Sequence, residues 1–252
     1  MRTWVLDCDG VLWRGDASIP GAGDFLTWAR GRGDQVLLCT NNAARTPRYL
    51  VEKVAELLGV EVEESEIITS AVVSGDLMAA RGVQRAVVLG MDGLRAAVRG
   101  AGVEVVESGP ADAVAVGLDL EVDYTKIGEA ASVVRAGGWF LASNTDATYP
   151  VPGGLRPGAG TIVAAVATAA GRPPDIVAGK PHHAMVEAVR ARALAEVTMV
   201  GDRPETDLAL AGAGGWRSVG VLTGVVSHRS EIPDRYTPDL LVDSIADLID
   251  HV

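Results

Sequence analysis

The sequence is poor in cysteine, in long apolar runs and in basic residues, and each shortage excludes a class of protein. Its only cysteines, Cys8 and Cys39, lie inside apolar strand-like runs and predict buried free thiols in a reducing compartment. The longest nearly apolar stretch, Thr161 to Ala170, is too short and too alanine-rich to cross a bilayer. Because the chain reaches Asp7 after six residues, we expect no signal peptide, no membrane partner and a cytoplasmic location.

The shortage of basic residues limits the kinds of ligand that the protein is expected to bind. Lys and Arg number 22 against 33 Asp and Glu, and the formal net charge is −11. Nucleic-acid binding needs clustered Lys and Arg against phosphates, so we expect no nucleic-acid partner. An anionic ligand would need local cations that overcome the field of the whole chain.

What the chain does contain is an alternation of strand-like and helical segments. Its 252 residues suffice for one large α/β domain, or for a core that carries a smaller insert. The alternation predicts parallel sheets flanked by helices. The predicted strands are Thr3–Leu6, Gln35–Cys39, Ala86–Leu89, Ala113–Gly117, Trp139–Ala142, Val197–Val200 and Ser218–Leu222. The predicted helices are Ala22–Arg30, Pro47–Leu58, Ala71–Ala80, Leu94–Gly100, Tyr124–Arg135, Thr161–Ala170, Pro181–Leu194 and Glu205–Ala213.

The most informative segment is the acidic pair that follows the first predicted strand. Side chains at i and i+2 of a strand project to the same side, so Asp7 and Asp9 place two carboxylates together. At an effective dielectric near 20, two such charges about 4 Å apart repel by roughly 4 kcal/mol. Gly10 then permits a sharp turn and a close approach of the backbone. The pair therefore indicates a bound cation or a shared proton, with a solvated acidic turn as the alternative.

Three further polar clusters each follow an apolar run. They are Thr40-Asn41-Asn42, Gly179-Lys180-Pro181 and the segment from Gly201-Asp202 to Asp207. In open parallel sheets, ligands bind outside the carboxyl ends of the strands. If the four preceding strands, including the run 175–178, share one sheet, all four clusters gather at one edge.

Such a set of side chains suits phosphoryl transfer. A carboxylate can attack phosphorus and form an aspartyl phosphate, while hydroxyl, amide and ammonium donors hold the phosphate oxygens. Mg²⁺ prefers carboxylate and carbonyl oxygens and can bring the anionic nucleophile next to an anionic phosphate. A second carboxylate can protonate the leaving alkoxide and then activate water.

The ordered set resembles the haloacid dehalogenase-like phosphohydrolase superfamily. Asp7-x-Asp9-Gly10 resembles its first motif, Thr40 with Asn41 and Asn42 its second, Lys180 its third, and Gly201-Asp202 with Asp207 its fourth. The wide gap between the second and third motifs resembles the branch of 4-nitrophenylphosphatases and phosphoglycolate phosphatases, which carries a large αβ cap. The resemblance implies a Rossmann-like parallel-sheet core over 1–81 and 178–252, with an inserted cap domain over 82–177.

The resemblance also implies residue roles. Asp7 would be the nucleophile and Asp9 the general acid and base. Mg²⁺ would be bound by the carboxylates of Asp7 and Asp202 and by the Asp9 main-chain carbonyl, with Asp207 behind them or bound through water. The phosphate would be held by Thr40, Asn41 and Lys180.

The implied activity is the Mg²⁺-dependent hydrolysis of a small-molecule phosphate monoester, so the expected partner is a small phosphorylated metabolite. A non-catalytic phosphometabolite sensor on the same fold is the alternative, although such a protein would be expected to lack a catalytic residue. A homodimer is compatible with the sequence. We expect substrate choice to lie in the cap loop Asn144–Pro157, with Asp146 and Tyr149 as specificity residues. An ordinary surface loop with Tyr149 packed inside the cap is the alternative.

Overall fold

The computed structural model describes residues 1–151 and 153–251, and the chain divides into two compact units. The first unit comprises Met1–Thr40, Arg48–Ile68 and Lys180–Val252, and the second comprises Asn41–Pro47 and Thr69–Gly179. Pro152 and Val252 lie outside the described residues. No described helix combines the length and the apolar composition that a membrane span requires.

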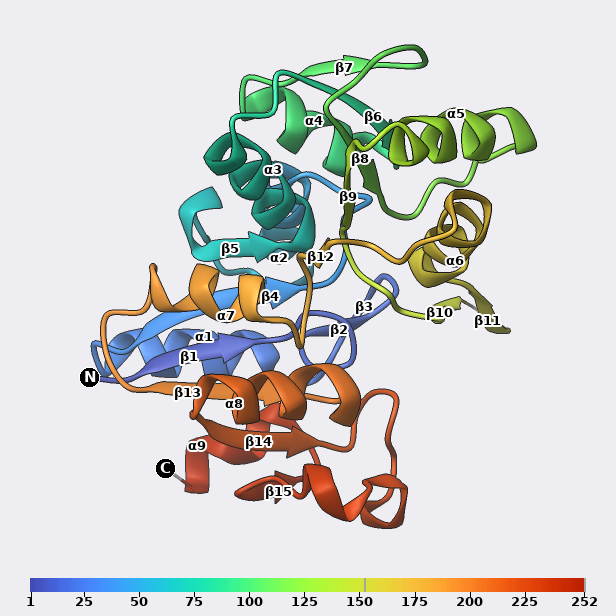
Figure 1. Cartoon of the computed structure of the whole chain (residues 1–252). Helices are drawn as coiled ribbons and strands as arrows, with labels where there is room; N and C mark the ends of the chain where they lie inside the picture. Colours follow the sequence, from blue (N-terminus) through green and yellow to red (C-terminus); the bar gives the residue numbers. More distant parts are fainter. Residues whose placement is uncertain (152, 252) are drawn as a thin grey trace. The chain divides into compact units, whose positions relative to one another are not determined.

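The first unit is built on a six-stranded sheet with the strand order β15-β14-β13-β1-β4-β5 (Figure 1). The four neighbouring pairs from β15 to β4 are parallel. Because β4 and β13 lie on opposite sides of β1, the strand order changes direction at β1, and such a switch point opens a crevice at the carboxyl ends. The strands are β1 Thr3–Leu6, β4 Gln35–Thr40, β5 Ile67–Thr69, β13 Val197–Gly201, β14 Arg217–Val221 and β15 Leu240–Val242.

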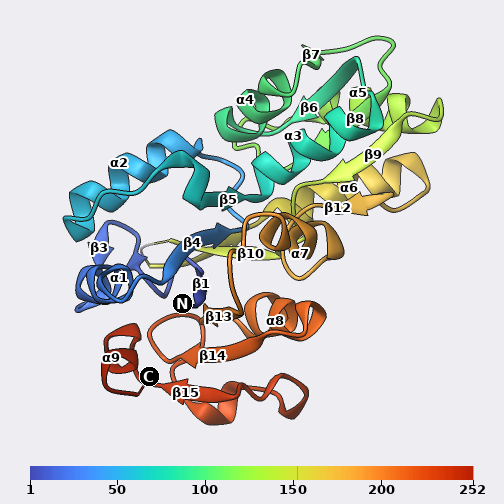
Figure 2. The ribbon, with the colours of Figure 1, turned by 90° about the vertical axis from the view of Figure 1, so that its left-hand side faces the viewer.

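Successive residues of a buried strand point to opposite sides of the sheet, so both faces must be covered, and helices cover both faces of this one. Trp4 and Leu6 of β1 belong to a core cluster with Phe25 of α1 and Leu248 of α9, and the rings of Trp4 and Phe25 meet edge to face at 5.1 Å. Figures 1 and 2 show α7 and α8 on the other face. The helices are α1 Ala22–Gly31, α2 Pro47–Leu58, α7 His183–Arg190, α8 Ala209–Gly214 and α9 Leu248–His251. Single turns occupy Glu64–Glu66, Pro204–Leu208, Arg229–Glu231, Asp234–Tyr236 and Ile245–Asp247.

The second unit contains a five-stranded parallel sheet with the order β12-β9-β8-β6-β7. One apolar cluster joins this sheet to α3 and α4, and another joins its opposite face to α5 and α6. Thr69 and Asp123 cap the N-termini of α3 and α5 with their side-chain oxygens. The strands are β6 Arg85–Leu89, β7 Glu104–Val106, β8 Ala113–Val116, β9 Trp139–Ala142 and β12 Ile176–Val177. The helices are α3 Ser70–Arg81, α4 Asp92–Gly100, α5 Tyr124–Arg135 and α6 Ala159–Ala170.

The α/β class and the parallel sheets are confirmed, while two local features differ from the interpretation of the sequence. The sequence left open whether the run before Lys180 shares the sheet of β1, β4 and β13, and it does not, because β12 pairs with β9 of the second unit. The predicted loop Asn144–Pro157 contains an antiparallel hairpin of β10, Thr148–Val151, and β11, Gly154–Pro157. Its two four-residue strands contain Pro150 and Pro157, and proline within a short run argues against a strand in the sequence.

The two compact units divide the chain at other positions than the predicted domains. The sequence predicts an insert over 82–177, whereas the second unit also includes α3 and the segment 41–47. Gly75 explains why α3 joins it, since a Cβ there would lie 2.6 Å from the Ala97 carbonyl oxygen of α4, so the helices pack closely. The role of residues 82–177 as a cap stays a prediction.

Candidate active site

Three aspartates of the first unit converge at the carboxyl edge of its sheet. Asp7 directly follows β1, Asp202 directly follows β13, and Asp207 lies in the π-helical turn Pro204–Leu208. One carboxylate oxygen of each lies within 4.8 Å of the others, and all three residues are buried. The edge that the sequence predicted as a meeting point therefore holds a compact acidic cluster at the switch point of the sheet.

Lys180 is the buried cation of this cluster. Its Nζ lies 2.5 Å from Oδ1 of Asp7 and 2.8 Å from Oδ1 of Asp207, and it donates to the Cys39 carbonyl oxygen at 2.9 Å. Since β12 belongs to the other sheet, Lys180 reaches Asp7 from a connecting segment and not from a strand of the core sheet.

The electrostatics of the cluster favour an added cation. Burial, reinforced by Asp207 and Asp202, raises the pKa of Asp7 well above its ordinary value despite the opposing charge of Lys180. Burial and Asp207 raise the pKa of Asp202 to about 6. Burial alone would lower the pKa of Lys180, but Asp207 and Asp7 outweigh it and hold that pKa well above its ordinary value. When all three carboxylates are ionised, they exceed the one ammonium by two negative charges, and their hard oxygen donors fit a divalent cation such as Mg²⁺.

Asp207 and Asp202 differ in how they are held. Asp207 accepts from the Arg203 backbone N–H at 3.0 Å and from the Thr206 hydroxyl at 3.2 Å, in addition to its ion pair with Lys180. Asp202 accepts from the Val225 backbone N–H at 2.5 Å. Asp207 therefore has more hydrogen-bond and ion-pair partners than Asp202, and its supporting role behind the metal ligands stays a prediction.

Two glycines allow the backbone to lie close to the Asp202 carboxylate. Gly10 has φ +89°, and a Cβ on it would lie 2.5 Å from Oδ2 of Asp202. A Cβ on Gly224 would collide with the same oxygen. The glycine of the first motif therefore serves both the turn and the close approach of Asp202.

Asp9 lies apart from the three-aspartate cluster. Its side chain is exposed, and the indole N–H of buried Trp13 donates to its Oδ1 at 3.1 Å. Although Asp9 is reached by solvent, partial desolvation by the surrounding protein raises its pKa, while Lys53 and the Trp13 hydrogen bond act in the opposite direction. A solvent-exposed carboxyl group with a raised pKa suits proton transfer.

Thr40 and Asn41 are neighbours in the chain but belong to different compact units. Thr40 ends β4, whose register places Leu38 beside Leu6, so Thr40 lies at the same edge as Asp7. In the second unit, Asn41 donates from Nδ2 to both carboxylate oxygens of Asp146, at 3.1 and 3.3 Å. Sequence reasoning assigned Asn41 to phosphate and Asp146 to specificity, and it did not anticipate this contact.

The other predicted specificity residue, Tyr149, is half-buried on β10 opposite Arg156 of β11. Pro152, which belongs to the predicted specificity loop Asn144–Pro157, lies outside the described residues. The specificity roles of Asp146 and Tyr149 stay predictions.

Both cysteines are buried free thiols, as predicted. Burial raises the pKa of the Cys8 thiol well above its ordinary value and that of Cys39 to about 12. Because the thiolate is the reactive form, these cysteines are poor nucleophiles.

Sequence reasoning missed two supports of the site. It gave Trp13 no role in the site, whereas the indole N–H of Trp13 donates to Asp9. It also gave no role to the stretch Leu222-Thr223-Gly224-Val225, whereas the Val225 backbone N–H donates to Asp202. The sequence offered one signal for both supports, because each stretch directly follows an apolar run.

Comparisons with known proteins agree with this geometry. Residues 4–104 match the family described as haloacid dehalogenase-like hydrolase, and residues 177–248 match a family described as HAD-hydrolase-like. The chain is 32% identical over 255 residues to an acid sugar phosphatase of Staphylococcus aureus, with 98% of each chain covered.

Two solved structures extend the similarity to the whole fold. A p-nitrophenyl phosphatase from Archaeoglobus fulgidus has a TM-score of 0.93 and 28% identity, with 99% of this chain and 98% of the other covered. A glycerol phosphate phosphatase from Mycobacterium tuberculosis, solved in complex with magnesium, has a TM-score of 0.88 and 33% identity, with 98% of this chain and 76% of the other covered. The same phosphatase was also solved in complex with calcium. The chain belongs to the haloacid dehalogenase-like hydrolases, in the branch of the 4-nitrophenylphosphatases.

Proposed function

We propose that this phosphatase hydrolyses a small-molecule phosphate monoester through an aspartyl phosphate on Asp7, with Mg²⁺ as its cofactor. The main evidence is the cluster of Asp7, Asp202 and Asp207 at the switch point of the sheet, in which the Lys180 ammonium pairs with Asp7 and Asp207. The named relatives, which are phosphatases, support the same activity.

In the first half-reaction, a carboxylate oxygen of Asp7 attacks phosphorus, and the bond between phosphorus and the leaving oxygen breaks. Asp9 donates its proton to the leaving oxygen, which departs as an alcohol. In the second half-reaction, the Asp9 carboxylate takes a proton from water, the water oxygen bonds to phosphorus, and the bond to Asp7 breaks. Inorganic phosphate leaves, and both aspartates return to their starting forms.

The phosphate oxygens need donors during both steps. The Lys180 Nζ lies 2.5 Å from Oδ1 of Asp7. Its ammonium can therefore stabilise negative charge first on the carboxylate and then on the transferring phosphoryl group. Thr40 lies at the same edge, and the Asn41 amide follows it in the chain. We assign phosphate binding to these three residues.

The metal would be held by the carboxylates of Asp7 and Asp202 and by the Asp9 carbonyl, with Asp207 behind them. When bound, Mg²⁺ neutralises charge between the nucleophile and the phosphate and polarises the phosphoryl oxygens. Magnesium in a related phosphatase structure supports this assignment.

We place the choice of substrate in the insert predicted over 82–177, with Asp146 and Tyr149 as the specificity residues. The relatives include a sugar phosphatase, a nitrophenyl phosphatase and a glycerol phosphate phosphatase, so the chemistry they share is that of the phosphate monoester. The non-catalytic sensor on the same fold would bind such esters without hydrolysing them.

The test is release of inorganic phosphate from a panel of phosphorylated sugars, polyols, nucleosides and carboxylic acids, ranked by kcat/KM. Acid-quenched enzyme should carry one phosphoryl group on Asp7, and Asp7→Asn protein should carry none. Binding of these esters without phosphate release by pure, Mg²⁺-loaded protein would favour the sensor.

A further inference from the structure

We propose that Trp13 is a positioning residue for proton transfer: its indole N–H orients the Asp9 carboxylate, and Lys53 secures the hairpin that carries Trp13. The proposal rests on the proposed function, because it requires Asp9 to act as the acid for a leaving group. All of the contacts involved lie within the first unit.

The indole is a rigid support for a side chain that is otherwise open to solvent. Trp13 is 1% exposed and packs in the main apolar cluster of the unit, whereas Asp9 is exposed. Its Nε1 donates to Oδ1 of Asp9 at 3.1 Å. Because an exposed carboxylate can rotate freely, one hydrogen bond from an immobile donor selects the orientation in which the acid meets its substrate.

The backbone around Trp13 is equally well held. Its N–H donates to the Cys8 carbonyl at 3.2 Å, and its own carbonyl accepts from the Gly10 N–H at 2.7 Å. The loop from Cys8 to Trp13 is thus closed at both ends, and it links the Asp9 backbone to the indole.

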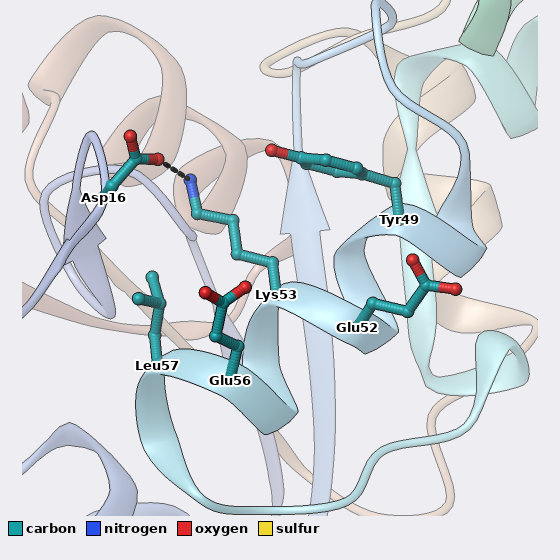
Figure 3. A pocket seen from close by; sticks show the side chains of 6 residues that line it. All are labelled: Asp16, Tyr49, Glu52, Lys53, Glu56 and Leu57. Atoms are coloured by element: carbon teal, nitrogen blue, oxygen red, sulfur yellow. Dashed lines mark ion pairs between the residues drawn. The ribbon is translucent and has the colours of Figure 1, made fainter.

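Lys53 of α2 secures the hairpin formed by β2, Trp13–Arg14, and β3, Ala17–Ser18 (Figure 3). Its Nζ donates to the Gly15 carbonyl at 2.7 Å, lies 3.8 Å from Oδ1 of Asp16, and stands 4.9 Å from the centre of the Trp13 ring. Figure 3 shows the side chain extending from α2 toward Asp16.

The other side of the hairpin is tied to the loop after β14. Arg14 donates from Nε to the Thr223 carbonyl, and the Thr223 hydroxyl donates to the Gly10 carbonyl at 2.7 Å. The hairpin therefore joins α2, the Asp7–Gly10 turn and the loop that binds Asp202. A hairpin in this position can keep the Asp9 carboxylate aligned with the phosphate.

The leaving group provides the discriminating measurement. An alkoxide must be protonated as it departs, whereas 4-nitrophenolate is stable enough to depart without a proton. An acid that is present but wrongly oriented therefore harms the hydrolysis of an alkyl phosphate more than that of 4-nitrophenyl phosphate. The measured quantity is kcat/KM, because it depends on the steps up to the release of the leaving group and does not depend on the later attack of water.

The test variant is Trp13→Phe, which removes the N–H and keeps most of the apolar volume. We expect kcat/KM to fall about tenfold for glycerol phosphate or another turned-over alkyl phosphate, as for loss of one hydrogen bond to a charged group. For 4-nitrophenyl phosphate we expect a change within about twofold, since proton donation contributes little there.

The chain offers a matched control in Trp4. It is also fully buried, and its indole N–H also donates to an aspartate, Oδ2 of Asp34, at 3.2 Å. Trp4→Phe should lower thermal stability to a similar extent and leave the ratio of the two kcat/KM values unchanged. Equal losses on both substrates in Trp13→Phe would make Trp13 a packing residue and overturn the proposal.

Two further variants separate the proposal from the proposed function. Asp9→Asn should show the same leaving-group dependence more strongly, by roughly 10²-fold or more. Adding Trp13→Phe to Asp9→Asn should bring no further dependence, and additive losses would contradict the proposal. If Trp13→Phe does not fold, Lys53→Met takes its place, with the same expected pattern and the same overturning result. Absence of phosphate release by the wild-type enzyme would instead overturn the proposed function.

Discussion

The two units share one architecture and differ in what stands at the strand ends. Each is a parallel sheet with helices on both faces. In the first unit, the residues after β1 and β13 are the buried carboxylates of Asp7 and Asp202, which cluster with Asp207, and Lys180 pairs with Asp7 and Asp207. In the second unit, the residues after β8 and β9 include Asp119, which pairs with Lys126 at 3.4 Å, and the neutral side chains of Ser143 and Asn144.

A fold supplies the place for a site but not the reactive groups that the site requires. A parallel sheet supplies an edge where loops converge, and it does so in both units. Uncompensated buried charge is found in the unit where the order of strands changes direction at β1. In the second unit, the polar groups are hydrogen-bonded to one another, as when Asn144 donates to the Asn41 carbonyl at 2.9 Å. We therefore expect chemistry to depend on the first unit and substrate choice on the second.

The largest expected effect is that of Asp7→Asn in the first unit. Removal of the nucleophile should lower kcat by at least about 10⁴-fold on every substrate. The fold should persist, because burial already favours the neutral form of this side chain. Phosphate release and thermal unfolding of the same preparation test both statements. Near-normal turnover by pure Asp7→Asn enzyme would remove Asp7 from the mechanism.

Removal of divalent metal should have the next largest effect. Excess chelator should lower activity by about 10²-fold or more, because the charge of the acidic cluster is then not offset when phosphate approaches. Mg²⁺ should restore activity, and Ca²⁺, which is larger and less demanding in geometry, should restore it poorly. Full activity in chelator would show that Lys180 alone balances the cluster.

The pH dependence of stability should reveal the buried charge of the first unit. The Asp202 pKa is about 6 in the fold, against an ordinary value of 3.8, so its contribution to stability is present below pH 3.8 and lost as pH rises through 6. At about 1.4 kcal/mol per pKa unit, ionised Asp202 costs the metal-free protein about 3 kcal/mol at pH 7.5. Urea unfolding in chelator should show the decline with rising pH.

Asp202→Asn is the control for this measurement. The variant lacks the titrating group, so its stability relative to the wild type should increase between pH 4.5 and 7.5. Mg²⁺ should stabilise the wild type more at pH 7.5 than at pH 4.5, because a ligand carboxylate must be ionised to bind it. A constant difference between the two proteins across this range would contradict the shifted pKa.

The smallest expected effect lies in the second unit. Tyr149→Ala should change the ranking of natural substrates by about threefold to tenfold in kcat/KM, since one apolar contact contributes about 1 kcal/mol, and should alter 4-nitrophenyl phosphate less. Asp146→Asn keeps the size of the side chain but changes the acceptor of the Asn41 amide. A uniform loss on all substrates in Asp146→Asn would show that Asp146 acts through Asn41 and not on the leaving group.

The sequence by itself determined the class of fold and most of the reacting groups. Apolar periodicity located β1, β4 and β13, because buried parallel strands read as short apolar runs bounded by polar residues. Helix α2 begins at Pro47 and ends at Leu58 as predicted, since proline at the start is a local signal. The acidic pair, Lys180 and Asp202 were all visible as polar residues after such runs.

The tertiary structure alone decided which of these groups meet and how each is held. Lys180 follows a strand of the other sheet, and its contact with Asp7 spans 173 positions of sequence that no local pattern covers. The Asn41–Asp146 contact and the Trp13–Asp9 hydrogen bond likewise depend on side-chain orientation. Local secondary-structure preference depends on neighbouring residues. Burial, shifted pKa values and long-range hydrogen bonds arise only when distant segments pack together and exclude water from between them.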